Sequence, residues 1–222
     1  MTVLASAEGR VLVHILVMAK APVPGRVKTR LCPPCTPDEA ASLAEAALAD
    51  TLDAVAGCGV DRRVLALDGE PGDWLPGGFD VVPQAGGSFD ERLAAAWDAA
   101  GGPGIQIGMD TPQVSADLLD DALCALDGAS SALGPTVDGG WWAIGLRRPD
   151  PVVFVGVPMS TTGTGAVQYR RLRALDLDVA LLPTLVDLDT VGDLPAVVDA
   201  APGSRTATLA ERLGLLPDME AA

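Results

Sequence analysis

Lysine and histidine are scarce in this 222-residue sequence, which contains two lysines and a single histidine. Thirty acidic residues stand against fifteen basic ones, so the formal net charge is −15 at pH 7. Nucleic acids and anionic membrane surfaces bind proteins through broad basic faces, which so acidic a chain lacks. We therefore expect partners that are neither nucleic acid nor membrane.

The scarcity of histidine and cysteine excludes several kinds of catalytic and metal centre. His14 is the only histidine and lies within an apolar run, so neither a Ser–His–Asp nor a Cys–His system can be assembled. Four cysteines are too few for a disulfide framework, and Cys32 and Cys35 lack the second pair that a zinc site would need. We expect His14 to be a packing residue.

Long apolar runs are also lacking, since none in the sequence reaches membrane-spanning length. Residues 11–19 have the length of a signal-peptide core, but Glu8 offsets Arg10 in front of them. The run also leads directly into a basic loop, as a first strand does. We expect a cytoplasmic protein.

What the sequence does contain is a regular alternation of strand and helix patterns. Residues 11–18 are continuously apolar, which is typical of a strand buried on both faces. Capping-box patterns at residues 36–39 (TPDE) and 88–91 (SFDE) open helices that end near residues 57 and 100. Further strands are expected at residues 63–67, 79–82, 104–108, 132–133, 141–146 and 179–182, and further helices at 115–126, 165–175, 190–199 and 206–213. This alternation predicts a single α/β domain over residues 10–216, with a mainly parallel sheet flanked by helices. The ends, residues 1–9 and 217–222, are expected to be flexible.

Both lysines lie in one loop after the first strand, residues 19–31 (AKAPVPGRVKTRL). Its cations are Lys20, Arg26, Lys28 and Arg30. Guanidinium and ammonium groups bind phosphate oxygens, and prolines such as Pro22 favour a stiff, preformed loop. Gly25 is its only glycine, so the loop is neither a Walker A sequence nor a GxGxxG turn. It predicts a diphosphate site; the alternative is a surface loop with chance basic residues.

Two other segments that carry acids follow strands of the same sheet. Open parallel sheets bind ligands beyond the carboxyl ends of their strands, so these segments are expected to meet the basic loop. Asp110 can hold Mg²⁺ or Mn²⁺, or it can cap the turn that follows it. Asp187 and Asp189 can supply further metal ligands, or they can be solvated beside a capping pair of Thr190 and Asp193.

Residues 134–142 (GPTVDGGWW) form the richest local run. Gly139 and Gly140 allow a close approach of the backbone to a ligand, and Asp138 can act as a general base or orient an acceptor hydroxyl. Trp141 and Trp142 can stack on a sugar or a base. The alternative is a tight turn with one inward tryptophan in the core.

Gln84 and Arg92 are the remaining candidates. Gln84 ends a predicted strand and can read the edge of a base. Arg92 lies one helical turn beyond a predicted cap and can reach a phosphate, or it can pair with an acid of its own helix.

Four runs in this order resemble a bacterial family of GT-A-like transferases, described as glycosyltransferases encoded beside radical-SAM, selenium-domain or arsenosugar proteins. They are AKAPVPGRVKTRL at residues 19–31, GMDTP at 108–112, GPTVDGG at 134–140 and DLDT at 187–190. The resemblance implies a Rossmann-like GT-A fold of the nucleotide-diphospho-sugar transferase superfamily. It also implies that the first-strand loop binds the nucleotide, that Asp110 holds the metal, and that Asp187 or Asp189 completes its site.

The resemblance favours a metal-dependent glycosyltransferase that takes a nucleotide sugar and a small-molecule acceptor. In it Lys28 stabilises the leaving diphosphate and Asp138 acts on the acceptor. One alternative is a nucleotidylyltransferase that joins an NTP to a phosphorylated small acid and releases pyrophosphate. A second is a non-catalytic nucleotide-binding protein, because Thr111, Trp141 and Met159 depart from the family pattern on the acceptor side. The sequence leaves open a homodimer.

Overall fold

The computed structural model describes residues 12–216, and the predicted flexible ends at 1–9 and 217–222 lie outside the described residues. The strands are β1 (His14–Lys20), β2 (Arg62–Asp68), β3 (Asp80–Pro83), β4 (Gly104–Ile107), β5 (Ser131–Pro135), β6 (Trp141–Leu146) and β7 (Val179–Leu181). The α-helices are α1 (Pro37–Gly57), α2 (Phe89–Ala100), α3 (Ala116–Gly128), α4 (Thr164–Ala174), α5 (Leu194–Ala200) and α6 (Arg205–Arg212). Three short 3₁₀ turns are η1 (Thr29–Leu31), η2 (Pro151–Val153) and η3 (Val191–Asp193).

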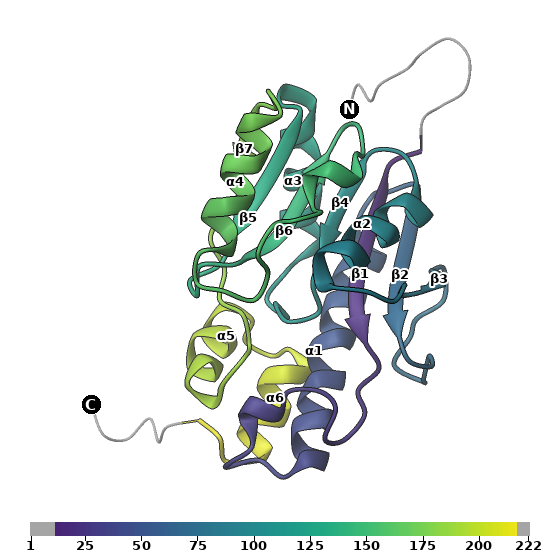
Figure 1. The fold of residues 1–222 in the computed structure, drawn as a ribbon. Helices are drawn as coiled ribbons and strands as arrows, with labels where there is room; N and C mark the ends of the chain where they lie inside the picture. Colours follow the sequence, from purple (N-terminus) through teal and green to yellow (C-terminus); the bar gives the residue numbers. More distant parts are fainter. Residues whose placement is uncertain (1–11, 217–222) are drawn as a thin grey trace.

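The apolar first strand is buried on both faces, as its composition predicts. Ile15 and Val17 belong to the core that α1 and α3 close on one side of the sheet. Leu16 and Met18 belong to a second core with α2 and α4 on the other side. Successive side chains of a strand point to opposite faces, so one apolar run fills both layers. Figure 1 shows β1 near the middle of the sheet with helices on either side.

The sheet has seven strands in the order β3-β2-β1-β4-β6-β5-β7. The predicted mainly parallel α/β fold is confirmed: β1 pairs in parallel with β2 and β4, β2 with β3, and β5 with β7. Only β6 runs antiparallel to its neighbours β4 and β5. The connection from β5 to β6 is a tight turn, which can join only antiparallel strands.

The helix starts follow the predicted capping patterns. At α1, Glu39 accepts from the backbone N–H of Thr36, and Thr36 Oγ1 accepts from the Glu39 N–H. At α2, Glu91 accepts from the Ser88 N–H. The helix expected from residue 190 begins instead as η3 and becomes α-helical at Leu194, because Pro195 lacks an N–H and fits only a first helical turn. Within residues 12–216, no helix combines the length and apolar character needed to cross a membrane.

The last two helices attach to the first. Leu43 and Ala47 of α1 pack with Leu194, Val197 and Ala210 of α5 and α6 in a third core cluster. Figure 1 shows α6 beside one end of α1. This arrangement anchors the segment between β7 and α5, which carries Asp187 and Asp189, at the edge where β1 and β4 end.

His14 is expected to make stability depend on pH. It is 1% exposed, and burial, followed by the positive charge of Arg62, lowers its pKa from 6.5 to about 4. The unfolded chain takes up a proton near pH 6.5 and the folded one only near pH 4. Neutral His14 therefore makes its full contribution to the free energy of unfolding above pH 6.5. That contribution, about 3 kcal/mol, is lost as the pH falls toward 4.

Urea unfolding of the wild type and of His14→Leu between pH 7.5 and 4.5 tests this expectation. The difference between the two free energies of unfolding isolates His14 from the carboxylates, which titrate in both proteins. The variant should lose less stability on acidification than the wild type. Equal losses would show that His14 is protonated in the folded protein as readily as in the unfolded one.

Candidate functional site

A cleft lies at the carboxyl ends of β1 and β4 and is divided by charge into two halves. The cationic half, a cavity of about 470 Å³, contains five basic side chains: Lys20, Arg26, Lys28, Arg30 and Arg92. The acidic half, about 700 Å³, contains five aspartates: Asp110, Asp138, Asp187, Asp189 and Asp193. The halves share Asp110, Asp189 and Arg30, so they are continuous. Together they have the size of a site for a nucleotide and a second small molecule.

The basic loop is folded by short local contacts. Gly25 adopts φ +74°, a left-handed conformation that suits glycine, and the Arg26 N–H donates to the Val23 carbonyl. Lys28 is also left-handed, at φ 47°, immediately before η1. Lys20, Arg26, Lys28 and Arg30 line the cleft as predicted. Pro22 and Gly25 shape the loop but do not line either half.

Lys28 lies where the three predicted segments meet. Its side chain is 6% exposed, and its Nζ is 2.5 Å from Asp110 Oδ1 and 3.5 Å from Asp189 Oδ1. It also donates to the Leu188 carbonyl. The Leu188 N–H donates to the Asp110 carbonyl at 2.8 Å, so the two acidic segments are joined through their backbones. Arg30 closes the group with a 2.9 Å ion pair to Asp189.

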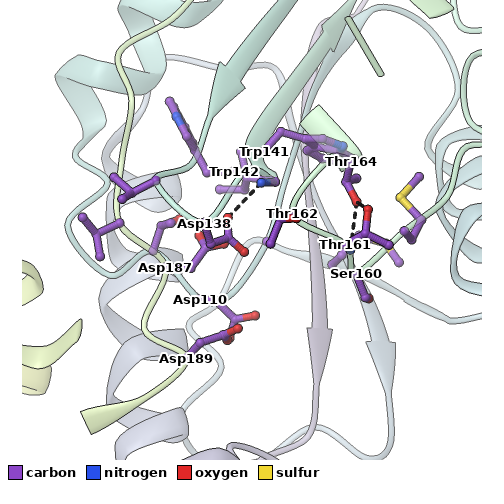
Figure 2. A pocket seen from close by; sticks show the side chains of 18 of the residues that line it. Asp110, Asp138, Trp141, Trp142, Ser160, Thr161, Thr162, Thr164, Asp187 and Asp189 are labelled. Atoms are coloured by element: carbon purple, nitrogen blue, oxygen red, sulfur yellow. Dashed lines mark hydrogen bonds between the residues drawn. The ribbon is translucent and has the colours of Figure 1, made fainter. Parts of the chain in front are cut away.

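Asp187 lies beside this group, close to several other carboxylates. Burial, followed by the nearby carboxylates of Asp110, Asp138 and Asp189, raises its pKa from 3.8 to about 7, against the opposing effect of Lys28. Figure 2 shows the side chains of Asp110, Asp187 and Asp189 near one another on the side of the cleft away from Thr161 and Ser160.

The donor atoms of this cluster suit a divalent cation, although they do not form a complete metal site. Mg²⁺ and Mn²⁺ take carboxylate oxygens, and Asp110, Asp187 and Asp189 offer them where negative charge is poorly compensated. Among residues 12–216, however, no three acidic, histidine or cysteine side chains are arranged to hold a metal ion. The Lys28 ammonium stands between Asp110 and Asp189 instead. These carboxylates would fit a divalent ion that takes its remaining ligands from phosphate oxygens.

Asp138 belongs to the tight turn between β5 and β6. Its Oδ1 accepts from Thr136 Oγ1 at 2.5 Å and from the Gly140 N–H at 2.8 Å. Within the described chain, its Oδ2 makes no hydrogen bond and the side chain makes no ion pair. The close approach that Gly139 permits is to the carbonyl of Thr162 in the same chain, rather than to a ligand.

Gly139→Ala is expected to destabilise the protein by about 2–4 kcal/mol. Gly139 has φ +91°, and an added Cβ would overlap the Thr162 carbonyl oxygen. Gly77→Ala is the matched control, because nothing lies within 4 Å of a Cβ built there. Urea unfolding of both variants measures the difference. Equal stabilities would mean that the turn and the loop 161–165 separate at little cost.

Gln84 and Arg92 lie in the cationic half, where their side chains are hydrogen-bonded to each other. Gln84 Nε2 donates to the carbonyls of Ala19 and Ala66, and its Oε1 accepts from Arg92. Both N–H groups of this amide are therefore used by β1 and β2. Recognition of a base edge by Gln84 stays a prediction, and it would require these hydrogen bonds to change. Arg92 differs, because its buried Nε has no hydrogen-bond partner among the described residues.

The two tryptophans have different places. Trp142 is 1% exposed and donates to the Pro183 carbonyl, so it is the inward tryptophan of the alternative interpretation. Trp141 lines the acidic half, and its Nε1 has no partner. Gln106, a buried amide that also lines this half, was not predicted as a site residue. Its signal was an amide within the otherwise apolar run Gly104–Ile107.

A protein-family model matches this chain. The family model described as "Uncharacterized protein conserved in bacteria (DUF2064)" matches residues 41–161, more than half of the chain. Among curated protein sequences, none matches.

Solved structures share the fold. A "putative nucleotide-diphospho-sugar transferase" from Desulfovibrio desulfuricans G20 is 28% identical with a TM-score of 0.81, over 91% of this chain and 95% of that one. Rv0371c from Mycobacterium tuberculosis H37Rv, in complex with manganese, is 18% identical with a TM-score of 0.50, over 86% and 100%. A cytidylyltransferase from Leptospira borgpetersenii serovar Hardjo-bovis (strain JB197) is 13% identical with a TM-score of 0.56, over 92% and 94%. The fold is thus that of nucleotide-diphospho-sugar transferases and cytidylyltransferases.

Proposed function

This chain belongs to the bacterial family DUF2064, and we propose that it is a metal-dependent glycosyltransferase that uses a nucleotide-diphosphate sugar. The division of the cleft by charge carries this proposal. Five of the fifteen basic residues of an acidic chain gather in the cationic half, next to an acidic half in which Arg30 is the one basic side chain among the described residues. The likeness to the Desulfovibrio protein supports a nucleotide sugar as the donor.

The cationic half is the place proposed for the nucleoside diphosphate. Lys28 and Arg26 neutralise phosphate oxygens, and Arg30 and Lys20 add positive charge along the same loop. Negative charge develops on the diphosphate as the bond to the sugar breaks. Cations already held in position stabilise that charge without reorganising at the moment of reaction.

Asp110 is the residue proposed to hold Mg²⁺ or Mn²⁺, with Asp187 or Asp189 as the second ligand. A divalent ion, when bound there, neutralises phosphate charge and assists departure of the diphosphate. The crowding of carboxylates around Asp187 supports this assignment, and so does the manganese complex of Rv0371c, which has the same fold.

Asp138 is proposed to act on the acceptor. The acceptor hydroxyl attacks the anomeric carbon of the sugar, and the bond from that carbon to the diphosphate oxygen breaks. The electron pair of that bond leaves with the nucleoside diphosphate. The hydroxyl proton passes to Oδ2 of Asp138, whose Oδ1 is held by Thr136 and the Gly140 N–H.

A thermal-shift screen of NTPs, nucleoside diphosphates and nucleotide sugars, with and without Mg²⁺ or Mn²⁺, tests the proposal. At a concentration 100 times Kd, a ligand should raise Tm by about 5–10 °C. One nucleotide sugar should give a metal-dependent shift larger than that of its NTP, and turnover should release a nucleoside diphosphate.

Two results would contradict it. Pyrophosphate released from an NTP would identify a nucleotidylyltransferase, the reaction class of the cytidylyltransferase neighbour. No shift with any nucleotide, in a folded sample, would show that the cationic half does not bind nucleotides.

A further inference from the structure

The acidic half contains several buried polar atoms that no group within residues 12–216 satisfies. Gln106 is fully buried, and while its Nε2 reaches the Leu93 carbonyl at 3.4 Å, its Oε1 has no partner. Thr111 is 1% exposed, and its Oγ1 also has none. The indole Nε1 of Trp141 is the third such atom. All three residues line the acidic half. Buried polar groups are nearly always hydrogen-bonded, so these atoms indicate a polar ligand.

The hydrogen-bonding types of these atoms describe the ligand. The Gln106 Oε1 can only accept, so it requires an O–H or N–H. The Trp141 N–H can only donate, so it requires an oxygen or another acceptor, and the Thr111 hydroxyl can do either. A hydroxyl group supplies both kinds of partner. Apolar side chains complete the wall, namely Met18, Phe89, Leu93, Trp141 and Met159.

The charges of the same half exclude an anion. Arg30 is its only basic side chain within the described chain, and Arg30 is already paired with Asp189 at 2.9 Å. Neither Asp138 nor Asp187 forms an ion pair with any described residue. A divalent ion on Asp110 would already be compensated by the diphosphate of the donor. A phosphate or carboxylate placed beside Asp138 would therefore meet an unpaired carboxylate with no cation left for it, and like charges at close quarters are strongly unfavourable.

Taking these observations together, we propose that the acidic half selects an acceptor that carries no anionic group: a neutral or cationic small molecule with an apolar part and a hydroxyl nucleophile. Gln106, Thr111 and Trp141 recognise its polar groups, and the carboxylates reject its phosphorylated or carboxylated counterparts. The inference rests on the proposed function in treating this half as the acceptor side. It separates the chain from transferases whose acceptor is a sugar phosphate.

Matched acceptor pairs test the proposal by binding first. An alkyl glycoside and an amino sugar are compared with a sugar 6-phosphate and a uronic acid of the same ring, with nucleoside diphosphate and Mn²⁺ present. The Kd values measured by calorimetry should be at least about 100-fold lower for the uncharged and cationic members than for the anionic ones. Tighter binding of the phosphorylated member, or no binding of any uncharged or cationic member, would overturn the proposal.

Turnover then separates this inference from the proposed function. Selective binding of uncharged acceptors without release of nucleoside diphosphate would preserve the acceptor site and reject the glycosyltransferase. Release of nucleoside diphosphate with the phosphorylated acceptor preferred would do the reverse.

The variants Thr111→Val and Gln106→Leu test whether these two residues form hydrogen bonds with the acceptor. Each removes a buried polar atom that has no partner within residues 12–216, and Gln106→Leu gives up in addition only the long contact to the Leu93 carbonyl at 3.4 Å. Tm should therefore change little in either variant. The Kd for the uncharged acceptor should weaken about 10-fold, as for loss of a hydrogen bond or two. A purely structural role would lower Tm and leave the ratio of uncharged to phosphorylated binding unchanged, and that pattern would overturn their assignment.

Discussion

Asp110→Asn is expected to lower metal-dependent turnover by about 10²–10³-fold while leaving the fold intact. The amide keeps the shape of the carboxylate, and Asp110 is at the end of β4 with 43% of its side chain exposed. What is lost is the charge that faces Lys28 and, in the proposed function, the metal. Initial rates across a Mn²⁺ titration measure the effect, and Tm should change by only a few degrees.

Asp121→Asn is the matched control for Asp110→Asn. It makes the same change of charge on the exposed side of α3 and lines neither half of the cleft. Its turnover should equal that of the wild type. Turnover that survives both Asp110→Asn and a chelator would show that the reaction needs no metal on this residue.

The fold could be predicted from the sequence because its signals are local. The apolar run of β1 and the capping boxes at Thr36 and Ser88 each report on neighbouring residues, and all were placed within a few positions. The antiparallel β6 was not predicted. Its direction depends on how the turn at residues 136–140 inserts the strand between β4 and β5, which is a matter of tertiary pairing.

The candidate site was predictable as a set of segments but not as a set of contacts. Strand-end topology brings Lys28, Asp110 and Asp189 together, as the sequence implied. The sequence could not show that Lys28 lies between the two carboxylates, because this depends on the left-handed backbone at Lys28 and on the Leu188–Asp110 hydrogen bond. Nor could it show that Gln84 uses its amide within the sheet.

Lys28 and Lys20 are the two lysines of the predicted loop. Replacing each in turn shows whether nucleotide binding depends on where a lysine lies or only on the total positive charge. Lys28→Met should weaken binding of nucleoside diphosphate by about 100-fold, because a buried, charge-assisted contact to phosphate is lost. Lys20→Met should weaken it by only a few fold, since Lys20 is exposed and makes no ion pair within the described residues. Calorimetric titration of both variants gives the ratio. Similar losses would mean that the loop acts only through its summed charge.

Lys28→Met should weaken the binding of nucleotide but strengthen the binding of a divalent metal ion. In the absence of nucleotide, the Lys28 ammonium occupies the space between Asp110 and Asp189, so it competes with a divalent ion for their oxygens. Removing it leaves Asp110 without an ion pair among the described residues and Asp189 paired with Arg30 alone, beside Asp187, whose pKa Lys28 also lowers. Mn²⁺ alone should therefore raise the Tm of Lys28→Met more than that of the wild type, and Lys28→Arg should restore the weak wild-type response. If Mn²⁺ stabilises the wild type and Lys28→Met equally, the metal does not share these oxygens with Lys28. A larger shift for Lys28→Met would mean that Lys28 and the metal compete for these oxygens, so that in the proposed function a diphosphate that draws Lys28 away would favour metal binding.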